Sequence, residues 1–354
     1  LLGPGLLGRI GMLLRELDLG LQVSVVTTPP VAERYGAGVS DSLAEAGFQV
    51  SVCSVPDGEV FKTLDTMRLV YDCLIEAGFD RSGIVMALGG GVVGDMAGLA
   101  AATYLRGVRL VQVPTSLLAM VDSSVGGKVA VDHPRGKNLI GAFKQPEAVI
   151  IDPQSLSTLP ARELANGLAE VVKTGLIGDP GLFQHIEAHG PAPMPWIIER
   201  AIRVKAAVVE EDPYESGRRV VLNLGHTFGH ALELLSDYHL SHGEGVAIGL
   251  VAAARLSARL GLCDEALPGR VEGVLSRLGL PTRCDNCWAG RPGAEMRNRV
   301  VPIGSQIWNA MATDKKRRGK RLRFILMRGI GDVFVTDQVQ RQDVLAVLRT
   351  LGAG

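Results

Sequence analysis

The sequence of 354 residues is poor in aromatic side chains and has no excess of charge of either sign. Its 37 Lys and Arg residues balance 37 Asp and Glu residues, which removes the electrostatic footprint of a protein that binds nucleic acid or an anionic membrane. Aromatic residues make up only 5% of the chain, which disfavours an antiparallel sandwich. No uncharged apolar run approaches the roughly 18 residues of a membrane span, and no segment has the pattern of a signal peptide.

Cysteine is also scarce, and the five cysteines are Cys53, Cys73, Cys263, Cys284 and Cys287. An odd number scattered over a long chain does not form a disulfide framework, so we expect a reducing, cytoplasmic setting. The one close pair, Cys284 and Cys287, has no second pair or nearby histidine to complete a zinc site, which favours a structural role.

The chain is long enough for about two domains and is rich in glycine, with 44 residues. In its first part, short β-rich runs alternate with helical patterns, which predicts βαβ units and a parallel sheet. We expect strands over residues 21–27, 48–55, 83–88, 109–113 and 148–151, and helices over residues 31–46 and 63–77.

The pattern changes near residue 156, where strands rich in Val and Ile nearly vanish. We therefore predict an α/β domain over residues 1–155 and a mainly helical domain over residues 156–354. Because the chain opens without Met, in Gly-Pro-Gly and a helical pattern, we also expect a strand or two upstream of it. In the second domain we expect helices over residues 161–176, 195–210, 226–235, 245–260, 267–278 and 340–351, and a lone strand over residues 321–327.

A glycine-rich stretch follows the third predicted strand and opens a helix. Gly89, Gly91 and Gly94 fit the pattern G-x-G-x-x-G, in which the backbone approaches a phosphate at a helix N-terminus. The stretch is not a Walker A loop, since no Lys-Ser/Thr follows. An ordinary dinucleotide fingerprint would follow the first strand and precede an acidic residue, which residues 96–121 lack. Tight packing of a βα turn explains the glycines equally well, and a bound ribose would need another partner, such as residues 57–59.

Histidines are concentrated in one short segment. His226 and His230 lie at i and i+4 on a predicted helix and share a face with Glu233, and His242 follows soon after. Zinc and similar metals bind neutral imidazoles together with a carboxylate, often with one position open for substrate. The segment is not a zincin motif, because Thr227 replaces the required Glu. Histidines that are satisfied in the core or on the surface are the alternative interpretation.

Several cations lie where packing alone would not predict them. Lys205 falls on the apolar stripe of the helix over residues 195–210, at i+7 from Ile198. Its stem can snorkel, but a desolvated ammonium needs an anionic partner, such as a substrate phosphate or carboxylate. Glu170 and Lys173 share the polar face of another helix, where a solvated ion pair is the simpler interpretation. Further cations suited to a small polyanion are Lys128, Lys137, Arg218, Arg219, Lys315 and Lys316.

Together these motifs resemble the 3-dehydroquinate synthase family, in collinear order over essentially the whole chain. The resemblance implies an α/β plus α fold, in which a Rossmann-like parallel-sheet NAD domain precedes a mainly helical metal- and substrate-binding domain. It also implies a cytoplasmic homodimer. The resemblance rests on residues 89–95 (GGGVVGD), 114–128 (PTSLLAMVDSSVGGK), 136–143 (GKNLIGAF), 168–173 (LAEVVK), 223–230 (NLGHTFGH), 242–249 (HGEGVAIG) and 314–316 (DKK).

The reaction that the resemblance implies is the second step of the shikimate pathway to chorismate and the aromatic amino acids. The substrate would be 3-deoxy-D-arabino-heptulosonate 7-phosphate (DAHP), converted to 3-dehydroquinate and phosphate. NAD would oxidise a ring hydroxyl transiently, and the ketone so formed would acidify the neighbouring C–H and allow phosphate elimination. Reduction, ring opening and an intramolecular aldol step would follow. A Zn²⁺ or Co²⁺ ion would bind substrate hydroxyls and lower their pKa.

The resemblance also implies roles for individual residues. The metal ligands match Glu170, His226 and His242, and a proton-transfer group beside the metal matches His230. Positions that hold the substrate match Asp122, Lys173, Lys205, Arg219 and Asn223. The phosphate-binding positions match Lys128, Asn138 and either Lys315 or Lys316, and a cation from the partner subunit matches Arg106. The NAD contacts match Asp57, Gly58, Glu59, Lys62, Gly91, Val92, Gly94, Asp95, Thr115, Ser116, Lys128 and Lys137.

Three features depart from the family pattern. The strand that normally precedes the opening Gly-Pro-Gly is absent, so we expect an incomplete sheet edge. Thr27 and Thr28 replace the usual Asn or Asp after the first strand, which removes one expected adenosine contact. The segment over residues 284–307 is longer than the family's usual link, and no role is assigned to it.

Other classes of protein share parts of this pattern. A sugar-phosphate cyclase that makes an inosose or a valiolone would alter the stretch over residues 122–128, which here keeps the Ser-Ser-Val-Gly-Gly form. A metal-dependent polyol dehydrogenase would consume NAD stoichiometrically and would not need the phosphate-binding residues. A dinucleotide-sensing module would need neither the metal ligands nor the substrate cations.

Overall fold

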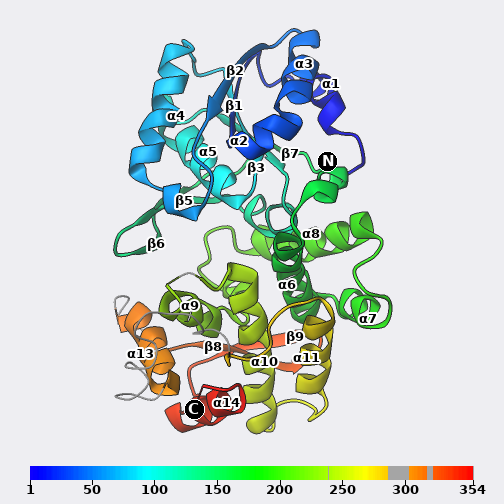
Figure 1. Cartoon of the computed structure of the whole chain (residues 1–354), viewed down its shortest axis with the longest axis vertical. Coiled ribbons are helices and arrows are strands. Elements are labelled where there is room, and N and C mark those ends of the chain that lie inside the picture. Colours follow the sequence, from blue (N-terminus) through cyan, green and yellow to red (C-terminus); the bar gives the residue numbers. More distant parts are fainter. Residues whose placement is uncertain (238, 286–302, 317–321, 354) are drawn as a thin grey trace. The chain divides into compact units, whose positions relative to one another are not determined.

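The computed structural model describes residues 1–237, 239–285, 303–316 and 322–353 (Figure 1). The chain divides into two compact units, Leu1–Leu164 and Ala165–Gly354. The division falls within helix α6 (Ala161–Gly178). Within these described ranges, no helix combines the length and apolarity needed to cross a membrane.

The first unit is built on a parallel five-stranded sheet with the order β2-β1-β3-β4-β7. Each strand lies where the runs of Val, Ile and Leu predict it. The residues Leu2 and Ile151 add a parallel bridge at the β7 end of the sheet. The strands are β1 (Gln22–Thr27), β2 (Gln49–Ser54), β3 (Ile84–Gly89), β4 (Arg109–Pro114) and β7 (Ala148–Val149).

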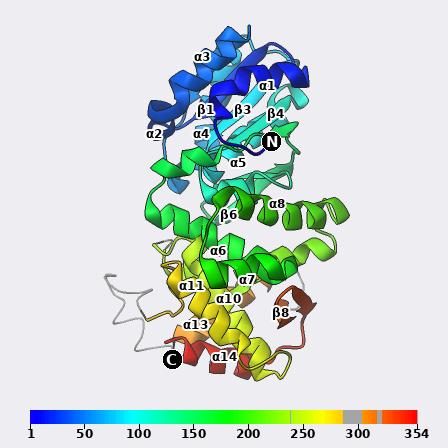
Figure 2. The same ribbon diagram turned by 90° about the vertical axis from the view of Figure 1, so that its right-hand side faces the viewer.

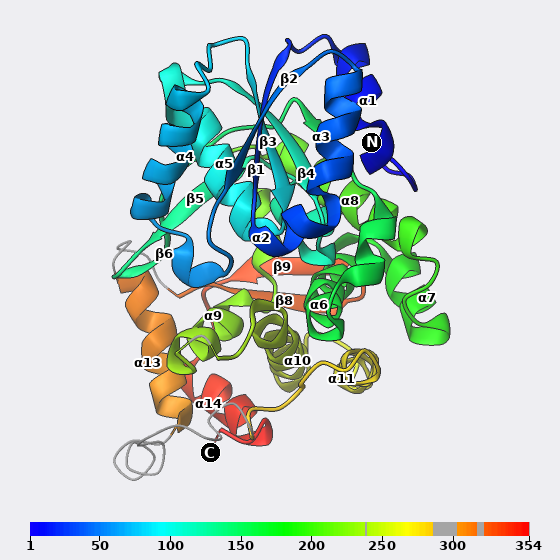
Figure 3. The same cartoon turned by 45° about the horizontal axis from the view of Figure 1, so that its top comes forward.

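Helices cover both faces of this sheet, which explains why most side chains of its central strands are apolar and buried. Successive side chains of a strand point to opposite faces, so Val25 packs into one core and Val26 into the other. In Figure 3, α1 and α3 lie on one side of the sheet and α4 and α5 on the other. The helices of this unit are α1 (Ile10–Leu17), α2 (Pro29–Val31), α3 (Ala37–Glu45), α4 (Leu64–Glu76) and α5 (Gly91–Thr103).

The strand order places the glycine-rich stretch at a topological switch point. From β1 the chain goes to β2 on one side and then to β3 on the other. In open α/β sheets, ligands bind outside the carboxyl ends of the strands at such a point. The strand β3 ends at Gly89 and α5 begins at Gly91, so the glycines lie at this edge.

A hairpin that the sequence analysis did not foresee adds β5 (Lys128–His133) and β6 (Gly136–Phe143) to the first unit. The strand β5 packs closely on α5, where a Cβ on Gly98 would lie 2.3 Å from Val129 Cγ1. The hairpin matters for function because it carries three of the predicted site residues.

The structure also pairs Cys53 of β2 with Cys73 of α4 in a disulfide, with the two Cα atoms 5.8 Å apart. The expectation of no disulfide therefore fails for this pair, because α4 packs across β2 and brings together two residues whose spacing gives no sign of it. Cys284 is buried and Cys287 lies outside the described residues, so the structural role of that pair stays a prediction.

The second unit is mainly helical, as predicted. The middle of its helix α10 is apolar and buried, and α10 packs against α9, α11, α14 and β8. Figure 2 shows α10 beside α11 and α14. The predicted lone strand is wrong, because β8 (Phe324–Gly329) pairs with β9 (Asp332–Thr336) in an antiparallel hairpin. The helices that follow α6 are α7 (Pro180–His189), α8 (Met194–Glu211), α9 (His226–Leu235), α10 (His242–Arg259), α11 (Leu267–Arg277), α13 (Ile303–Lys316) and α14 (Arg341–Thr350).

Candidate active site

The three predicted metal ligands converge within the second unit. Glu170 lies on α6, His226 is the first residue of α9, and His242 is the first residue of α10. Their ligand atoms all lie within 4.8 Å of one another. The Oε1 atom of Glu170 is 3.7 Å from His226 Nε2 and 3.5 Å from His242 Nε2.

This cluster fits a small divalent cation. Bonds of 2.0–2.1 Å in tetrahedral geometry place ligand atoms roughly 3.4 Å apart, close to the two separations found here. Both Glu170 oxygens are buried, and neither accepts a hydrogen bond of ordinary geometry from the described residues. The Nδ1 atom of His226 donates to Leu224 O at 3.1 Å, and that of His242 donates to Glu233 Oε1 at 3.0 Å. Both rings therefore keep Nε2 turned toward Glu170.

Burial shapes the charges of this cluster. Glu170 and Lys173 form an ion pair whose side chains are 1% and 3% exposed, so the simpler interpretation of a solvated pair is wrong. Burial alone would raise the pKa of Glu170, but Lys173 and the two histidines hold it well below its usual value. Burial, and then the Lys173 cation, lowers the pKa of His226 well below its usual value, which keeps its ring neutral. Burial opposes the charge of His242, yet Glu170 and Glu233 raise its pKa to about 10, so a metal would displace a proton there.

Four glycines bring the two histidine-bearing helices together. Gly225 and Gly229 of the α9 segment face Gly245 and Gly249 of α10. A Cβ on Gly249 would lie 2.0 Å from Gly225 O, and one on Gly229 would lie 3.0 Å from the backbone of Gly245. Because only glycine permits this approach, the two G-x-x-x-G spacings explain why His226 and His242 meet. The spacing was visible in the sequence but was not used.

The third histidine of interest, His230, lies one turn after His226 on α9. Its ring is exposed, and its centroid is 5.1 Å from that of His226 and 6.1 Å from that of His242. The two helix histidines therefore differ in burial, one buried in the cluster and one exposed beside it, and their different roles stay a prediction.

Two predicted substrate cations are buried in the second unit. Lys205 lies on the same buried face of α8 as Ile198 and Val208, and is only 8% exposed. Arg219 is 2% exposed, and its guanidinium donates to Pro213 O at 2.6 Å. Close by, Asn223 donates from Nδ2 to Glu215 Oε1 at 3.0 Å.

The loop that carries these last residues is organised by Asp212, a residue that sequence reasoning missed. Its carboxylate accepts hydrogen bonds from the backbone N–H groups of Ser216, Gly217 and Arg219, at 2.9, 2.7 and 3.0 Å. Burial alone would raise the pKa of Asp212, but these hydrogen bonds outweigh it and lower the pKa to about 2. An Asp that ends a helix before a loop with Pro, Ser and Gly is the signal that could have identified it.

In the first unit, Lys62 joins predicted NAD residues to the hairpin. Its Nζ is 2.5 Å from Asp95 Oδ2 and donates to Asn138 Oδ1 at 2.6 Å. Burial raises the pKa of Asp95 to about 6, against the pull of Lys62. Burial alone would lower the pKa of Lys62, but Asp95 and Glu59 outweigh it and raise the pKa. A second, more exposed pair joins Lys137 of the hairpin to Glu59 at 3.5 Å.

The glycine-rich stretch at the start of α5 leaves little room for side chains. A Cβ on Gly91 would lie 3.0 Å from Ser123 Oγ, and one on Gly94 would lie 2.9 Å from Gln112 Oε1. Beside it, the backbone N–H of Thr115 donates to Gly89 O at 3.0 Å, which brings residues 115–116 to the same edge. A helix N-terminus with little room for side chains suits a dinucleotide phosphate.

The remaining predicted residues are less closely gathered. Around the glycine-rich stretch, Val92 is half-buried in α5 and Asp122 lies in a short helical turn, Ala119–Ser123. Asp57 is exposed, followed by Gly58 with φ 111°. Arg106 and Lys128 are also exposed. The side chains of Lys315 and Lys316, at the end of α13, lie outside the described residues.

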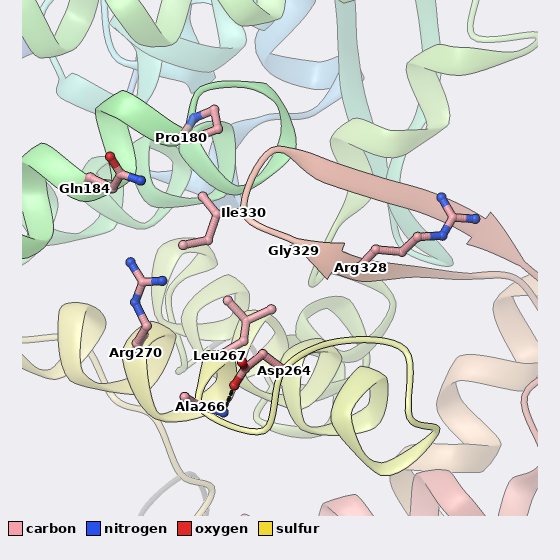
Figure 4. A pocket seen from close by; sticks show the side chains of 9 residues that line it. All are labelled: Pro180, Gln184, Asp264, Ala266, Leu267, Arg270, Arg328, Gly329 and Ile330. Atoms are coloured by element: carbon pink, nitrogen blue, oxygen red, sulfur yellow. Dashed lines mark hydrogen bonds between the residues drawn. The ribbon is translucent and has the colours of Figure 1, made fainter.

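A cavity of about 320 Å³ in the second unit contains none of these residues (Figure 4). Pro180, the start of α11 and the turn between β8 and β9 line it. Two of its polar groups already have partners: Arg270 pairs with Glu187 at 2.6 Å, and Asp264 accepts from Ala266 N at 2.7 Å. Since none of the predicted site residues lines the cavity, the catalytic site is not assigned to it.

Fold and site together define a class of protein: an α/β enzyme with a nucleotide-type switch point in one unit and a divalent-metal cluster in a helical unit. The family models described as 3-dehydroquinate synthase N-terminal and C-terminal match residues 52–166 and 167–317. The chain belongs to the 3-dehydroquinate synthase family.

Individual relatives agree with this assignment. The 3-dehydroquinate synthase of Synechococcus sp. is 46% identical, over 98% of this chain and 94% of that protein. The 2-epi-5-epi-valiolone synthase of Streptomyces hygroscopicus, solved with NAD⁺ and Zn²⁺, is 30% identical with a TM-score of 0.87, over 99% of this chain and 96% of that one. A 2-deoxy-scyllo-inosose synthase complexed with carbaglucose-6-phosphate, NAD⁺ and Co²⁺ is 27% identical with a TM-score of 0.84, over 98% and 95% of the two chains.

Proposed function

We propose that this chain is a 3-dehydroquinate synthase, which converts DAHP to 3-dehydroquinate and phosphate with NAD and a divalent metal, Zn²⁺ or Co²⁺. The observation that carries the proposal is the convergence of Glu170, His226 and His242, in a chain whose relatives of the same length are synthases of this family. The intact Ser-Ser-Val-Gly-Gly stretch favours dehydroquinate over an inosose or a valiolone.

In this proposal, Glu170, His226 and His242 hold the metal, which when bound polarises substrate hydroxyls and lowers their pKa. The exposed ring of His230 transfers a proton at a hydroxyl of the substrate. Buried Lys173, Lys205 and Arg219 hold the substrate with Asn223 and Asp122, and their cations face its anionic groups.

NAD, when bound, accepts a hydride and returns it. The residues that would hold its phosphates are Gly91, Val92 and Gly94, at the start of α5. The pairs Lys62–Asp95 and Lys137–Glu59 support this placement, since they connect predicted NAD residues to one another and to the hairpin. The other proposed contacts to NAD are Asp57, Gly58, Thr115, Ser116 and Lys128.

The substrate phosphate is proposed to bind Lys128, Asn138 and one of Lys315 and Lys316. Arg106 is proposed to reach the site of a partner subunit in a homodimer, and its exposure supports this proposal. The cytoplasmic location is proposed from the family resemblance.

The test is an assay of the purified chain with DAHP, NAD and Zn²⁺, in which released phosphate and 3-dehydroquinate are measured together. We expect equal amounts of the two products and no activity after removal of the metal by a strong chelator. Absence of phosphate release with DAHP would refute the assignment as a 3-dehydroquinate synthase. Oxidation of a polyol with formation of NADH would instead identify the chain as a dehydrogenase.

A further inference from the structure

The buried carboxylate of Glu233 has no part in the reaction described above, yet it lies directly behind a metal ligand. Its Oε1 accepts a hydrogen bond from His242 Nδ1 at 3.0 Å. The opposite nitrogen of that ring, Nε2, faces Glu170 Oε1 at 3.5 Å. The imidazole of His242 is thus held between two carboxylates, one on each side.

The other histidine of the cluster is held in the same way by a different group. The Nδ1 atom of His226 donates to the backbone carbonyl of Leu224, and its Nε2 faces Glu170. An imidazole offers Nε2 to a metal when Nδ1 carries the proton and the ring is turned correctly, and a hydrogen bond at Nδ1 fixes both. A backbone group fixes His226, whereas the group that fixes His242 is a side chain.

The packing of α9 against α10 brings Glu233 to this position. Glu233 lies two turns after His226 on α9 and is 2% exposed. Gly245 of α10 makes room for it, since a Cβ there would lie 3.2 Å from Glu233 Cγ and 3.4 Å from Oε1. A buried carboxylate is unfavourable without polar partners, so the bond to His242 is a specific feature of the site.

We propose that Glu233 is a positioning residue of the metal centre, which orients His242 and keeps the proton on its Nδ1 so that Nε2 binds the metal. This inference rests on the metal site proposed above. Glu233 could instead be a ligand together with His230 and His242, whose ligand atoms also lie close together. Among the described residues, the buried Glu170 oxygens accept no hydrogen bond of ordinary geometry, which favours the first cluster, and the experiment separates the two.

The experiment measures the affinity of the full chain for Zn²⁺ by competition with a chromophoric chelator, and the visible spectrum of the Co²⁺ form. Glu233→Met keeps the volume and removes the acceptor, while Glu233→Gln keeps a neutral acceptor. We expect the Zn²⁺ Kd to rise about 10- to 100-fold in Glu233→Met and about three- to tenfold in Glu233→Gln, with altered Co²⁺ bands in both. If Glu233→Met fails to fold, Glu233→Gln decides.

Two control variants give the Zn²⁺ Kd expected without any effect and the Kd expected after loss of a ligand. Glu272→Gln removes the carboxylate of the half-buried pair with Arg255, at 2.7 Å in the same unit, and should leave the Zn²⁺ Kd unchanged. His226→Ala shows the loss expected for a ligand. A Kd within about twofold of the unmodified chain in either Glu233 variant overturns the proposal, even with reduced thermal stability, because it indicates a purely structural role. A loss equal to that of His226→Ala also overturns it, because Glu233 is then a ligand. Failure of the unmodified chain to bind Zn²⁺ would instead refute the metal site itself.

Discussion

The two units hold their chemically active side chains in different ways. In the second unit, two of the metal ligands are buried and the third is half-buried, and they come from α6 and from the consecutive helices α9 and α10. In the first unit, the residues proposed for NAD lie on loops, on the start of α5 and on a hairpin, and ion pairs connect some of them. Metal ligands must be placed within a few tenths of an ångström, which rigid helix packing provides, whereas a long cofactor suits many separate loop contacts.

Loss of one metal ligand should have the largest effect. We expect His226→Ala to lower kcat/KM with DAHP by about 10³-fold or more, because polarisation of the substrate hydroxyls is worth several kcal/mol. Steady-state kinetics and metal analysis would measure this. The exposed His189 of α7 is the matched control, and His189→Ala should keep full activity. Equal activity in the two variants would refute the metal cluster.

In the first unit, Lys62→Met should cost about 3 kcal/mol of unfolding free energy, because it leaves Asp95 buried without its cation. The double variant with Asp95→Leu should recover much of this loss. Lys137→Met removes the more exposed pair with Glu59 and should cost about 0.5 kcal/mol or less. Denaturant titrations give all three values, and similar losses in both single variants would show that burial does not distinguish the pairs.

Close helix packing in the second unit is tested by Gly249→Ala. The added Cβ would lie 2.0 Å from Gly225 O, so α9 and α10 must separate, at a cost of about 2–3 kcal/mol. Zinc affinity should fall with stability, since His226 and His242 move apart. Gly269→Ala on α11 meets no atom within 4 Å and should be neutral or stabilising. An unaltered Zn²⁺ Kd in Gly249→Ala would contradict the role of this packing.

The smallest effect concerns Asp212. Its pKa of about 2 lies below the usual 3.8, so its hydrogen bonds stabilise the fold above about pH 4, and this contribution is lost as the pH falls toward 2. Asp212→Asn should remove this acid dependence and, by loosening the loop of Arg219, raise KM for DAHP about tenfold with a smaller change in kcat. Acid titration of stability and kinetics at neutral pH test both parts. If Asp212→Asn lost stability at acid pH as the unmodified chain does, Asp212 would not anchor the loop.

Much of the fold follows from local patterns in the sequence, and the failures have physical causes. The strands β1, β3 and β4 are predictable because most of their side chains on both faces are apolar. The hairpin of β5 and β6 is not, since β6 is glycine-rich and largely exposed. Burial of Glu170 and Lys173 could not be predicted either, because an i, i+3 pair is usually solvated and only tertiary packing decides otherwise.

In the candidate site, too, some features follow from the sequence and others depend on tertiary packing. The sequence placed His226, His230 and Glu233 on one helix face, but nothing local indicates that Glu233 binds His242 Nδ1. That bond depends on the close approach of α9 and α10. Partners of this kind become visible only when the fold is known.

The central claim is that the chain uses NAD catalytically while it eliminates phosphate. The most direct measurement is the number of phosphate molecules released from DAHP per molecule of NAD, with absorbance of NADH followed at the same time. The account predicts many turnovers per NAD with equal 3-dehydroquinate and no net NADH. One NADH formed per substrate consumed would contradict it.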